Sequence, residues 1–134
     1  MYNAKERKLE LDGISMNYIS FGKGEKNLIM IQGLNTNGIS GSANMLGFMY
    51  RIFAKDYKVH IFDRRDNIDK DITVREFASD IAFAMDKLEI RSADVLGVSQ
   101  GGMIAQYLAI DRPDLVNKLV LAVTLSKKNE TIET

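Results

Sequence analysis

The chain has 134 residues, 46% of them hydrophobic, which is a usual size for one domain with its own core. Its 18 basic and 18 acidic residues balance, so no net field attracts it to nucleic acid or to an anionic membrane. With no cysteine and one histidine, the sequence excludes disulfides and thiolate metal sites, and we expect no metal and no cofactor.

The amino-terminal residues lack the pattern of a targeting segment. The stretch MYNAKERKLELDG carries charge where a signal peptide needs an apolar run. No stretch reaches the roughly 20 apolar residues of a membrane span. We therefore expect one cytoplasmic domain over residues 1–134, with no nucleic-acid or membrane partner.

A β-hairpin is predicted first, over residues 8–22. The segment alternates in polarity, and Asp12-Gly13 suits the positive φ angles of a tight turn. Short apolar runs follow, spaced roughly 25 to 35 residues apart, and such runs are typical of strands buried on both faces. These predicted strands are residues 28–31, 59–62, 95–98 and 119–123.

Three helices are predicted between these strands. One begins after Thr73, because Thr73 and Glu76 form a T-x-x-E capping box ahead of apolar residues at helical spacing. The others cover residues 43–54 and 101–110, and Pro113 stands just beyond the last. Strands that alternate with helices indicate βαβ crossovers. We therefore expect an α/β fold: a mostly parallel sheet of about six strands, with helices on both faces.

The strand over 95–98 leads into Gly97-Val98-Ser99-Gln100-Gly101-Gly102 and then a helix. This is a G-x-S-x-G pattern in a strand-turn-helix context, in which a strained turn projects the serine hydroxyl above the sheet. The glycines Gly97 and Gly101 leave room for neighbouring backbone. The following helix directs N–H groups and a positive dipole end at the turn. Ser99 is therefore the candidate nucleophile.

A second loop is predicted beside this serine. The strand over 28–31 runs into Gln32-Gly33-Leu34-Asn35. In acyl transfer, an oxyanion is held by the N–H of the residue after the nucleophile and by one from a neighbouring strand-end loop. We expect the backbone N–H groups of Gln100 and Leu34 to form this oxyanion hole.

With these motifs, the chain resembles the α/β-hydrolase superfamily, in its branch of small soluble esterase-like, haloperoxidase-like and peptidase-like enzymes. The resemblance covers nearly the whole chain, through LIMIQG, VHIFDRRD, GVSQGG and DRPDLVNKLVLAV. Two motifs depart from it: Gln32 stands where members commonly have histidine, and Asp63-Arg64-Arg65-Asp66 replaces the start of a glycine-rich D-x-R-G-x-G-x-S. The resemblance implies a small-molecule ester, amide or related acyl substrate and an acyl-enzyme at Ser99.

The triad histidine is missing. The family order is serine, acid, histidine, and no histidine follows Ser99. His60 lies within a predicted strand and is interpreted as structural. Asp111 and Asp114 lie at the far end of the helix from Ser99, and Glu130 and Glu133 lie in a polar tail. The resemblance thus implies the N-terminal part of a hydrolase domain, without cap or last two strands, and inactive alone.

The strand over Leu119 to Val123 would then form a sheet edge. An apolar edge strand with unpaired N–H and C=O groups attracts another strand. We expect it to pair either with a missing C-terminal segment or with a second copy of the chain.

Two other functions fit parts of the sequence. A non-catalytic binding module on the same fold is compatible with the missing histidine. A Rossmann-type nucleotide-binding domain is suggested by Gly33-Leu34-Asn35-Thr36-Asn37-Gly38, which nearly matches G-x-G-x-x-G. Asn35 replaces the middle glycine of that motif, and Asp63 lies 30 residues from Gly33 where roughly 20 are expected.

Overall fold

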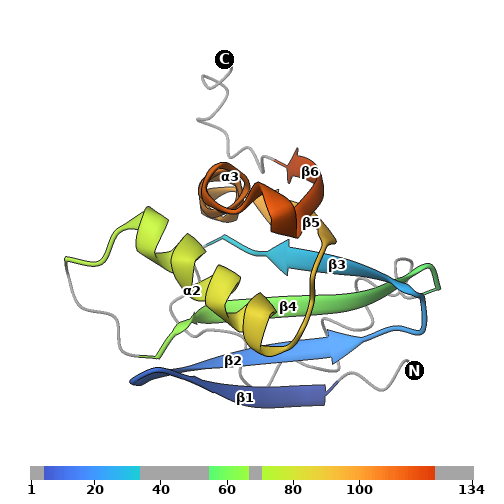
Figure 1. Cartoon of the computed structure of the whole chain (residues 1–134), viewed down its shortest axis with the longest axis horizontal. Coiled ribbons are helices and arrows are strands. Elements are labelled where there is room, and N and C mark those ends of the chain that lie inside the picture. The colour runs from blue at the N-terminus through green and yellow to red at the C-terminus, as the bar shows by residue number, and fades with distance from the viewer. Residues whose placement is uncertain (1–4, 34–54, 67–70, 123–134) are drawn as a thin grey trace.

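The computed structural model describes residues 5–33, 55–66 and 71–122, which form one mostly parallel sheet and two α-helices. The sheet has six strands in the order β1-β2-β4-β3-β5-β6 (Figure 1). The strands are β1 Lys5–Leu11, β2 Ile14–Phe21, β3 Lys26–Ile31, β4 Tyr57–Arg65, β5 Ala93–Val98 and β6 Val116–Ala122. The helices are α2 Val74–Lys87, α3 Gln100–Asp111 and the short 3₁₀ helix η2 Pro113–Leu115.

The strand pairing confirms the predicted hairpin and crossovers. β1 and β2 are antiparallel and turn at Gly13, whose φ is +86°. β2 is also antiparallel to β4, whereas the pairs β3–β4, β3–β5 and β5–β6 are parallel. A Rossmann sheet has the order 3-2-1-4-5-6 with parallel strands, so this topology argues against the nucleotide-binding alternative.

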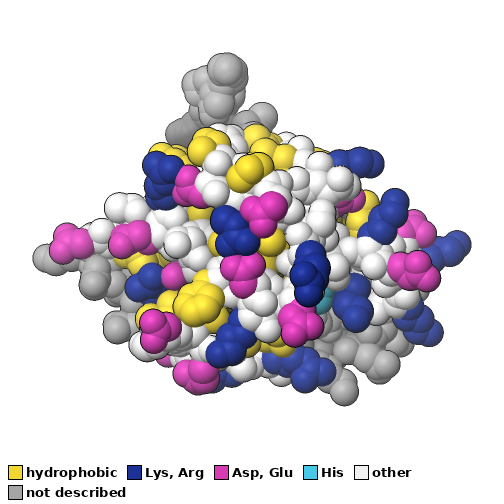
Figure 2. Space-filling model, in the orientation of Figure 1, with side chains coloured by type: hydrophobic (Ala, Val, Ile, Leu, Met, Phe, Trp, Pro, Cys, Tyr) yellow, Lys and Arg dark blue, Asp and Glu magenta, His cyan; other side chains and the backbone are white. Residues whose placement is uncertain are grey.

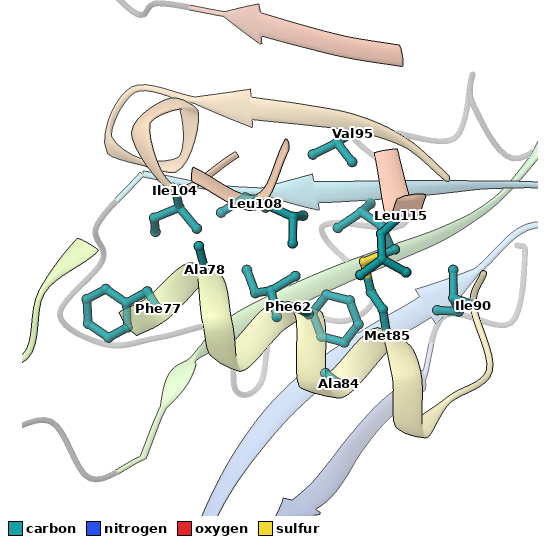
Figure 3. Close-up of a cluster of buried hydrophobic side chains, with 14 of the residues drawn as sticks. Phe62, Phe77, Ala78, Ala84, Met85, Ile90, Val95, Ile104, Leu108 and Leu115 are labelled. Atoms are coloured by element: carbon teal, nitrogen blue, oxygen red, sulfur yellow. The ribbon is translucent and has the colours of Figure 1, made fainter. Parts of the chain in front are cut away.

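The main core lies between one face of the sheet and the helices α2 and α3 (Figure 3). Helix α2 is amphipathic and directs Phe77, Ile81 and Met85 into this layer, while α3 contributes Ile104 and Leu108. The sheet meets them with Ile29, Ile31, Phe62 and Val95, none of which is more than 1% exposed. The two helices therefore lie on the same face.

The opposite face of the sheet has its own apolar cluster. It comprises Ile19, Phe21, Leu28, Met30, Val59 and Ile61. Of these, Ile19, Met30, Val59 and Ile61 are fully buried. The helix predicted over residues 43–54 lies outside the described residues.

Helix α2 begins as its sequence predicts. Thr73 is its N-cap, the Thr73 hydroxyl accepts a hydrogen bond from the Glu76 N–H at 3.1 Å, and the Glu76 carboxylate accepts one from the Thr73 N–H at 2.9 Å. This reciprocal pair satisfies two N–H groups at the helix terminus. Helix α3 extends one residue beyond the predicted range at each end, and Pro113, just beyond it as predicted, is the first residue of η2.

The four strands predicted from apolar runs all begin two or three residues earlier than predicted, and the bounds of β4 and β6 differ most. β4 continues three residues past Phe62, because β2 continues beside it and Met16 pairs with Arg65 across a bulge. These added residues are polar, so the apolar run alone ends too early. β6 begins at Val116, where Val116 pairs with Ala93 before the apolar run starts.

Two charged residues at the end of β4, Arg65 and Asp66, anchor it to neighbouring elements. Arg65 forms a bidentate pair with Asp80 of α2, with both N–O distances at 2.8 Å and Asp80 buried. Asp66 accepts hydrogen bonds from the hydroxyl of Ser15 at 2.5 Å and from its N–H at 3.1 Å. These contacts fix the carboxyl end of β4 to α2 and to the start of β2.

Candidate active site

Ser99 lies at the turn between β5 and α3, with φ of 58° and ψ of −120°. A non-glycine residue with positive φ is strained, and such strain is concentrated at functional sites. Ser99 is the N-cap of α3, yet its hydroxyl makes no capping hydrogen bond, unlike the usual N-cap serine. The side chain is exposed, so its hydroxyl remains available to a ligand.

The glycines around this turn are required by close backbone contacts. A Cβ atom on Gly101 would lie 2.0 Å from the Ile31 carbonyl oxygen at the end of β3. A Cβ atom on Gly97 would lie 2.5 Å from the Gly101 carbonyl oxygen and 2.7 Å from the Gly102 Cα atom. All three distances are far below van der Waals contact. The sequence therefore allows a tight strand-to-helix turn that packs directly on β3.

The end of β3 lies beside the serine, as the two motifs predict. A Cβ atom on Gly33 would lie 3.3 Å from Ser99 Cβ and 3.8 Å from Ser99 Oγ. Gln100, which follows the serine, is the first residue of α3, where N–H groups lack intrahelical partners. Leu34, the other expected oxyanion donor, lies outside the described residues.

β6 supports the turn from its other side. The Ser99 N–H donates to the Ala122 carbonyl at 3.0 Å, at the carboxyl end of β6. The Gly102 N–H donates to the Ser99 carbonyl at 2.9 Å and closes the first turn of α3. The backbone on both sides of the hydroxyl is therefore fixed.

Sequence reasoning missed Arg64, the next residue after Asp63 near the end of β4. Its Nη2 donates to the Gln32 carbonyl at 3.0 Å and to the Gln100 Oε1 at 2.7 Å. Its guanidinium carbon lies 5.6 Å from the centre of the Phe77 ring. Burial lowers the pKa of Arg64, and the nearby Asp63 opposes this effect. Its place at the carboxyl end of a parallel strand, where ligand sites form, was the available signal.

His60 lies away from the elbow. His60, Ile29 and Val95 share one row of the sheet, and Ser99 follows four residues after Val95, about 13 Å further along the strands. His60 is buried, and its Nδ1 and Nε2 atoms lie 2.9 Å from Ser20 Oγ and 3.1 Å from Asn27 Oδ1. These contacts support its interpretation as a structural residue.

The two described acids that follow Ser99 are held by arginines. Asp111 pairs with Arg75, whose hydrogen bonds lower the pKa of Asp111. Asp114 pairs with Arg112, which lowers the pKa of Asp114 in the same way. Neither contacts His60 or Ser99 through a hydrogen bond recorded among the described residues. Glu130 and Glu133 lie outside them.

Other site types are not seen in this part of the chain. Among residues 5–33, 55–66 and 71–122, no three His, Cys, Asp or Glu side chains are grouped to hold a metal ion. The same residues contain no helix that is long and apolar enough to cross a membrane.

A mostly parallel sheet with a serine on a strained strand-to-helix turn defines the class of α/β-hydrolase-like proteins. The family model described as "alpha/beta hydrolase fold" matches residues 26–134. The chain therefore belongs to the α/β-hydrolase fold family.

Named relatives agree with this assignment. The chain is 25% identical over 127 residues to 3-oxoadipate enol-lactonase 2 of Acinetobacter baylyi, covering 91% of this chain and 46% of that protein. It is 30% identical over 118 residues to a 2-hydroxy-6-oxononadienedioate/2-hydroxy-6-oxononatrienedioate hydrolase of a Pseudomonas species, covering 84% and 41%.

Among solved structures, Est816, an N-acyl homoserine lactone degrading enzyme, matches with a TM-score of 0.70 and 26% identity, covering 86% of this chain and 44% of Est816. The chain thus spans less than half the length of these relatives.

Proposed function

We propose that this chain is the nucleophile-bearing part of a serine hydrolase that cleaves a small ester, amide or related acyl substrate. The observation that carries the proposal is Ser99, held at a positive φ with its exposed hydroxyl free of any capping bond. The packing of Gly33 and Gly101 around it supports the same reading, because it brings β3 to the serine.

In this reaction, Ser99 Oγ attacks the substrate carbonyl carbon while its proton passes to a general base. The oxyanion that forms accepts hydrogen bonds from the N–H groups of Gln100 and Leu34. The carbon–heteroatom bond then breaks, the leaving group takes the proton, and an acyl-enzyme remains. Water hydrolyses this ester, which releases the acid and restores the serine.

His60, the one histidine of the sequence, is not placed to act as the general base for Ser99. Its ring is engaged by Ser20 and Asn27, and the two described acids after Ser99 are held by arginines. General-base assistance is typically worth about 10² to 10⁴ in rate. We therefore propose that residues beyond this chain provide the acid and the histidine, and that the chain alone is inactive.

A fluorophosphonate probe tests the nucleophile. We expect the probe to label the full-length protein, and peptide mapping to locate it on Ser99, because the reagent needs an activated serine. The 134-residue chain alone should remain unlabelled under the same conditions. Labelling that persists in the Ser99→Ala variant of the full-length protein would remove Ser99 from the mechanism.

Lactones are the first substrates to assay, since two of the relatives carry enol-lactonase or lactone-degrading activity in their names. A lactone is a cyclic ester, so the acyl-enzyme mechanism applies unchanged, with the alcohol retained on the same molecule. Hydrolysis of lactones but not of open-chain esters of similar size would define the substrate class. A full-length protein with an intact triad but no acyl hydrolysis would instead support a binding module.

We also propose that another strand covers β6, either from a C-terminal segment of the same protein or from a second copy. Leu119, Val120 and Leu121 are 37%, 52% and 43% exposed, and apolar side chains gather over α3 and β6 in Figure 2. β6 pairs with β5 on one edge, and β6 is the last strand of the sheet described. Such an edge favours association.

Analytical ultracentrifugation of the 134-residue chain tests this proposal. We expect dimers or larger species at high concentration, and a shift toward monomer in the Val120→Lys variant, because a charge on an edge strand opposes pairing. Circular dichroism confirms that the variant is folded. A wild-type chain that stays monomeric at high concentration would contradict self-association, and added C-terminal segment would then be tested for binding.

A further inference from the structure

The guanidinium of Arg64 connects two segments that border Ser99. Its Nη2 donates to the carbonyl of Gln32, at the end of β3, and to the side-chain oxygen of Gln100, at the start of α3. The distances are 3.0 Å and 2.7 Å, both within ordinary hydrogen-bond range. One side chain from β4 therefore links the segments that lead to the two expected oxyanion donors.

We propose that Arg64 is a positioning residue that holds the two halves of the oxyanion hole in register. This inference rests on the proposed function and extends it to a residue that the elbow motif does not contain. Arg64 acts through Gln32 and Gln100.

The bond to Gln32 fixes a peptide plane. In a trans peptide the carbonyl of Gln32 and the N–H of Gly33 point in opposite directions, so holding one orients the other. Gly33 leads directly to Leu34 and lies against Ser99. A rotated peptide at residues 32–33 would therefore move Gly33, which lies against Ser99.

The bond to Gln100 acts on the other half. Gln100 provides the expected N–H next to the nucleophile, and its side chain is half-buried. A Cβ atom on the next residue, Gly101, would lie 2.7 Å from the Gln32 carbonyl oxygen, so the two segments are already in contact. Arg64 adds hydrogen bonds to both segments, one to Gln32 and one to Gln100.

The surroundings of Arg64 suit a fixed guanidinium. Phe77 of α2 covers it, and its Nε atom is buried without a hydrogen-bond partner among the described residues. The unpaired Nε–H costs free energy, because a buried donor without a partner has lost its hydrogen bond to water. The same planar guanidinium donates two hydrogen bonds through Nη2. Lysine offers a single ammonium on a flexible stem and lacks this planar geometry.

The test uses Arg64→Lys and Arg64→Met, with Arg75→Lys and Arg75→Met as matched controls. Arg75 also lies over an aromatic ring, that of Tyr107, but it is exposed and pairs with Asp111. In the full-length enzyme, we expect Arg64→Met to lower kcat and the fluorophosphonate labelling rate by about 10- to 100-fold with little change in KM. Arg64→Lys should recover only part of this loss, and both Arg75 variants should match wild type.

A second readout does not depend on catalysis. In NMR spectra of the full-length enzyme, Arg64→Met should shift the side-chain amide signals of Gln100 and the backbone amide signal of Gly33, and Arg75→Met should leave them unchanged. The inference would be overturned if Arg64→Met kept the kcat and the labelling rate of the wild-type enzyme. It would also be overturned if the Gln100 signals did not shift in Arg64→Met. An unlabelled wild-type enzyme with shifted Gln100 signals would instead contradict the proposed function.

Discussion

Replacing Gly101 with alanine should destabilise the chain by about 3 kcal/mol or more. Gly102→Ala should leave the stability unchanged or increase it by up to about 1 kcal/mol. The two glycines are neighbours in the same first turn of α3, and both are buried. Only Gly101 faces the backbone of β3, where a Cβ atom would lie 2.0 Å from the Ile31 carbonyl oxygen. On Gly102 the nearest atoms would lie 3.6 Å away, which is ordinary contact.

The difference follows from which atoms would have to move. The neighbours of Gly101 are main-chain atoms of the central strand β3, which pairs with β4 and β5 and has no free side. Relief would require moving α3 away from the sheet or opening the turn at Ser99. Gly102 gains helix propensity from alanine without such a clash.

Urea unfolding of the two variants measures this effect, with the midpoint and the slope fitted separately. A Gly101→Ala variant as stable as wild type would show that the elbow does not pack on β3 as described. If Gly102→Ala were the more damaging change, the contacts assigned to α3 would be wrong.

A structural feature can be predicted from the sequence when residues close together in the chain determine it. The hairpin turn at Gly13 and the capping box at Thr73 follow from residues within a few positions of each other, and the structure places both where the sequence predicts them. The end of β4 was predicted too early, since Arg65 is held in the strand by Met16 of β2. Polar residues that extend a strand by pairing leave no apolar signal.

The candidate site likewise has some features set by the order of elements and others set by long-range contacts. Ser99 and Gly33 come together because parallel strands end at one edge, which the order of elements implies. The sequence motif places Arg64 only in an altered loop, because its partners Gln32 and Gln100 are 32 and 36 positions away. Long-range hydrogen bonds of this kind depend on strand order, which no short motif contains.

His60 should titrate with a pKa of about 4, and the chain should lose about 3 kcal/mol of stability as the pH falls from 6.5 to 4. Burial of the ring is the main cause of the lowered pKa, and the positive charge of Lys58 adds to it. In the unfolded chain the same ring has a pKa near 6.5. Each pKa unit of difference corresponds to about 1.36 kcal/mol.

The direction follows from proton binding. Between pH 6.5 and 4 the unfolded chain binds a proton at His60 that the folded chain does not, so acid favours unfolding in this range. The stabilising contribution is complete above pH 6.5 and is lost by the time the folded ring protonates. In the neutral ring Nε2–H donates to the Asn27 Oδ1 atom, which can only accept, and Nδ1 accepts from the Ser20 hydroxyl.

His60 is the one histidine of the sequence, so the histidine Hε1 signal in NMR spectra reports its pKa without further assignment. Unfolding measured at pH 7 and pH 4 in wild type and in His60→Gln isolates its effect, because the carboxylates are common to both chains. The stability advantage of wild type over His60→Gln should shrink by about 3 kcal/mol on acidification. A ring that titrates near 6.5 would mean that His60 is solvated, and its interpretation as a buried structural residue would have to be given up.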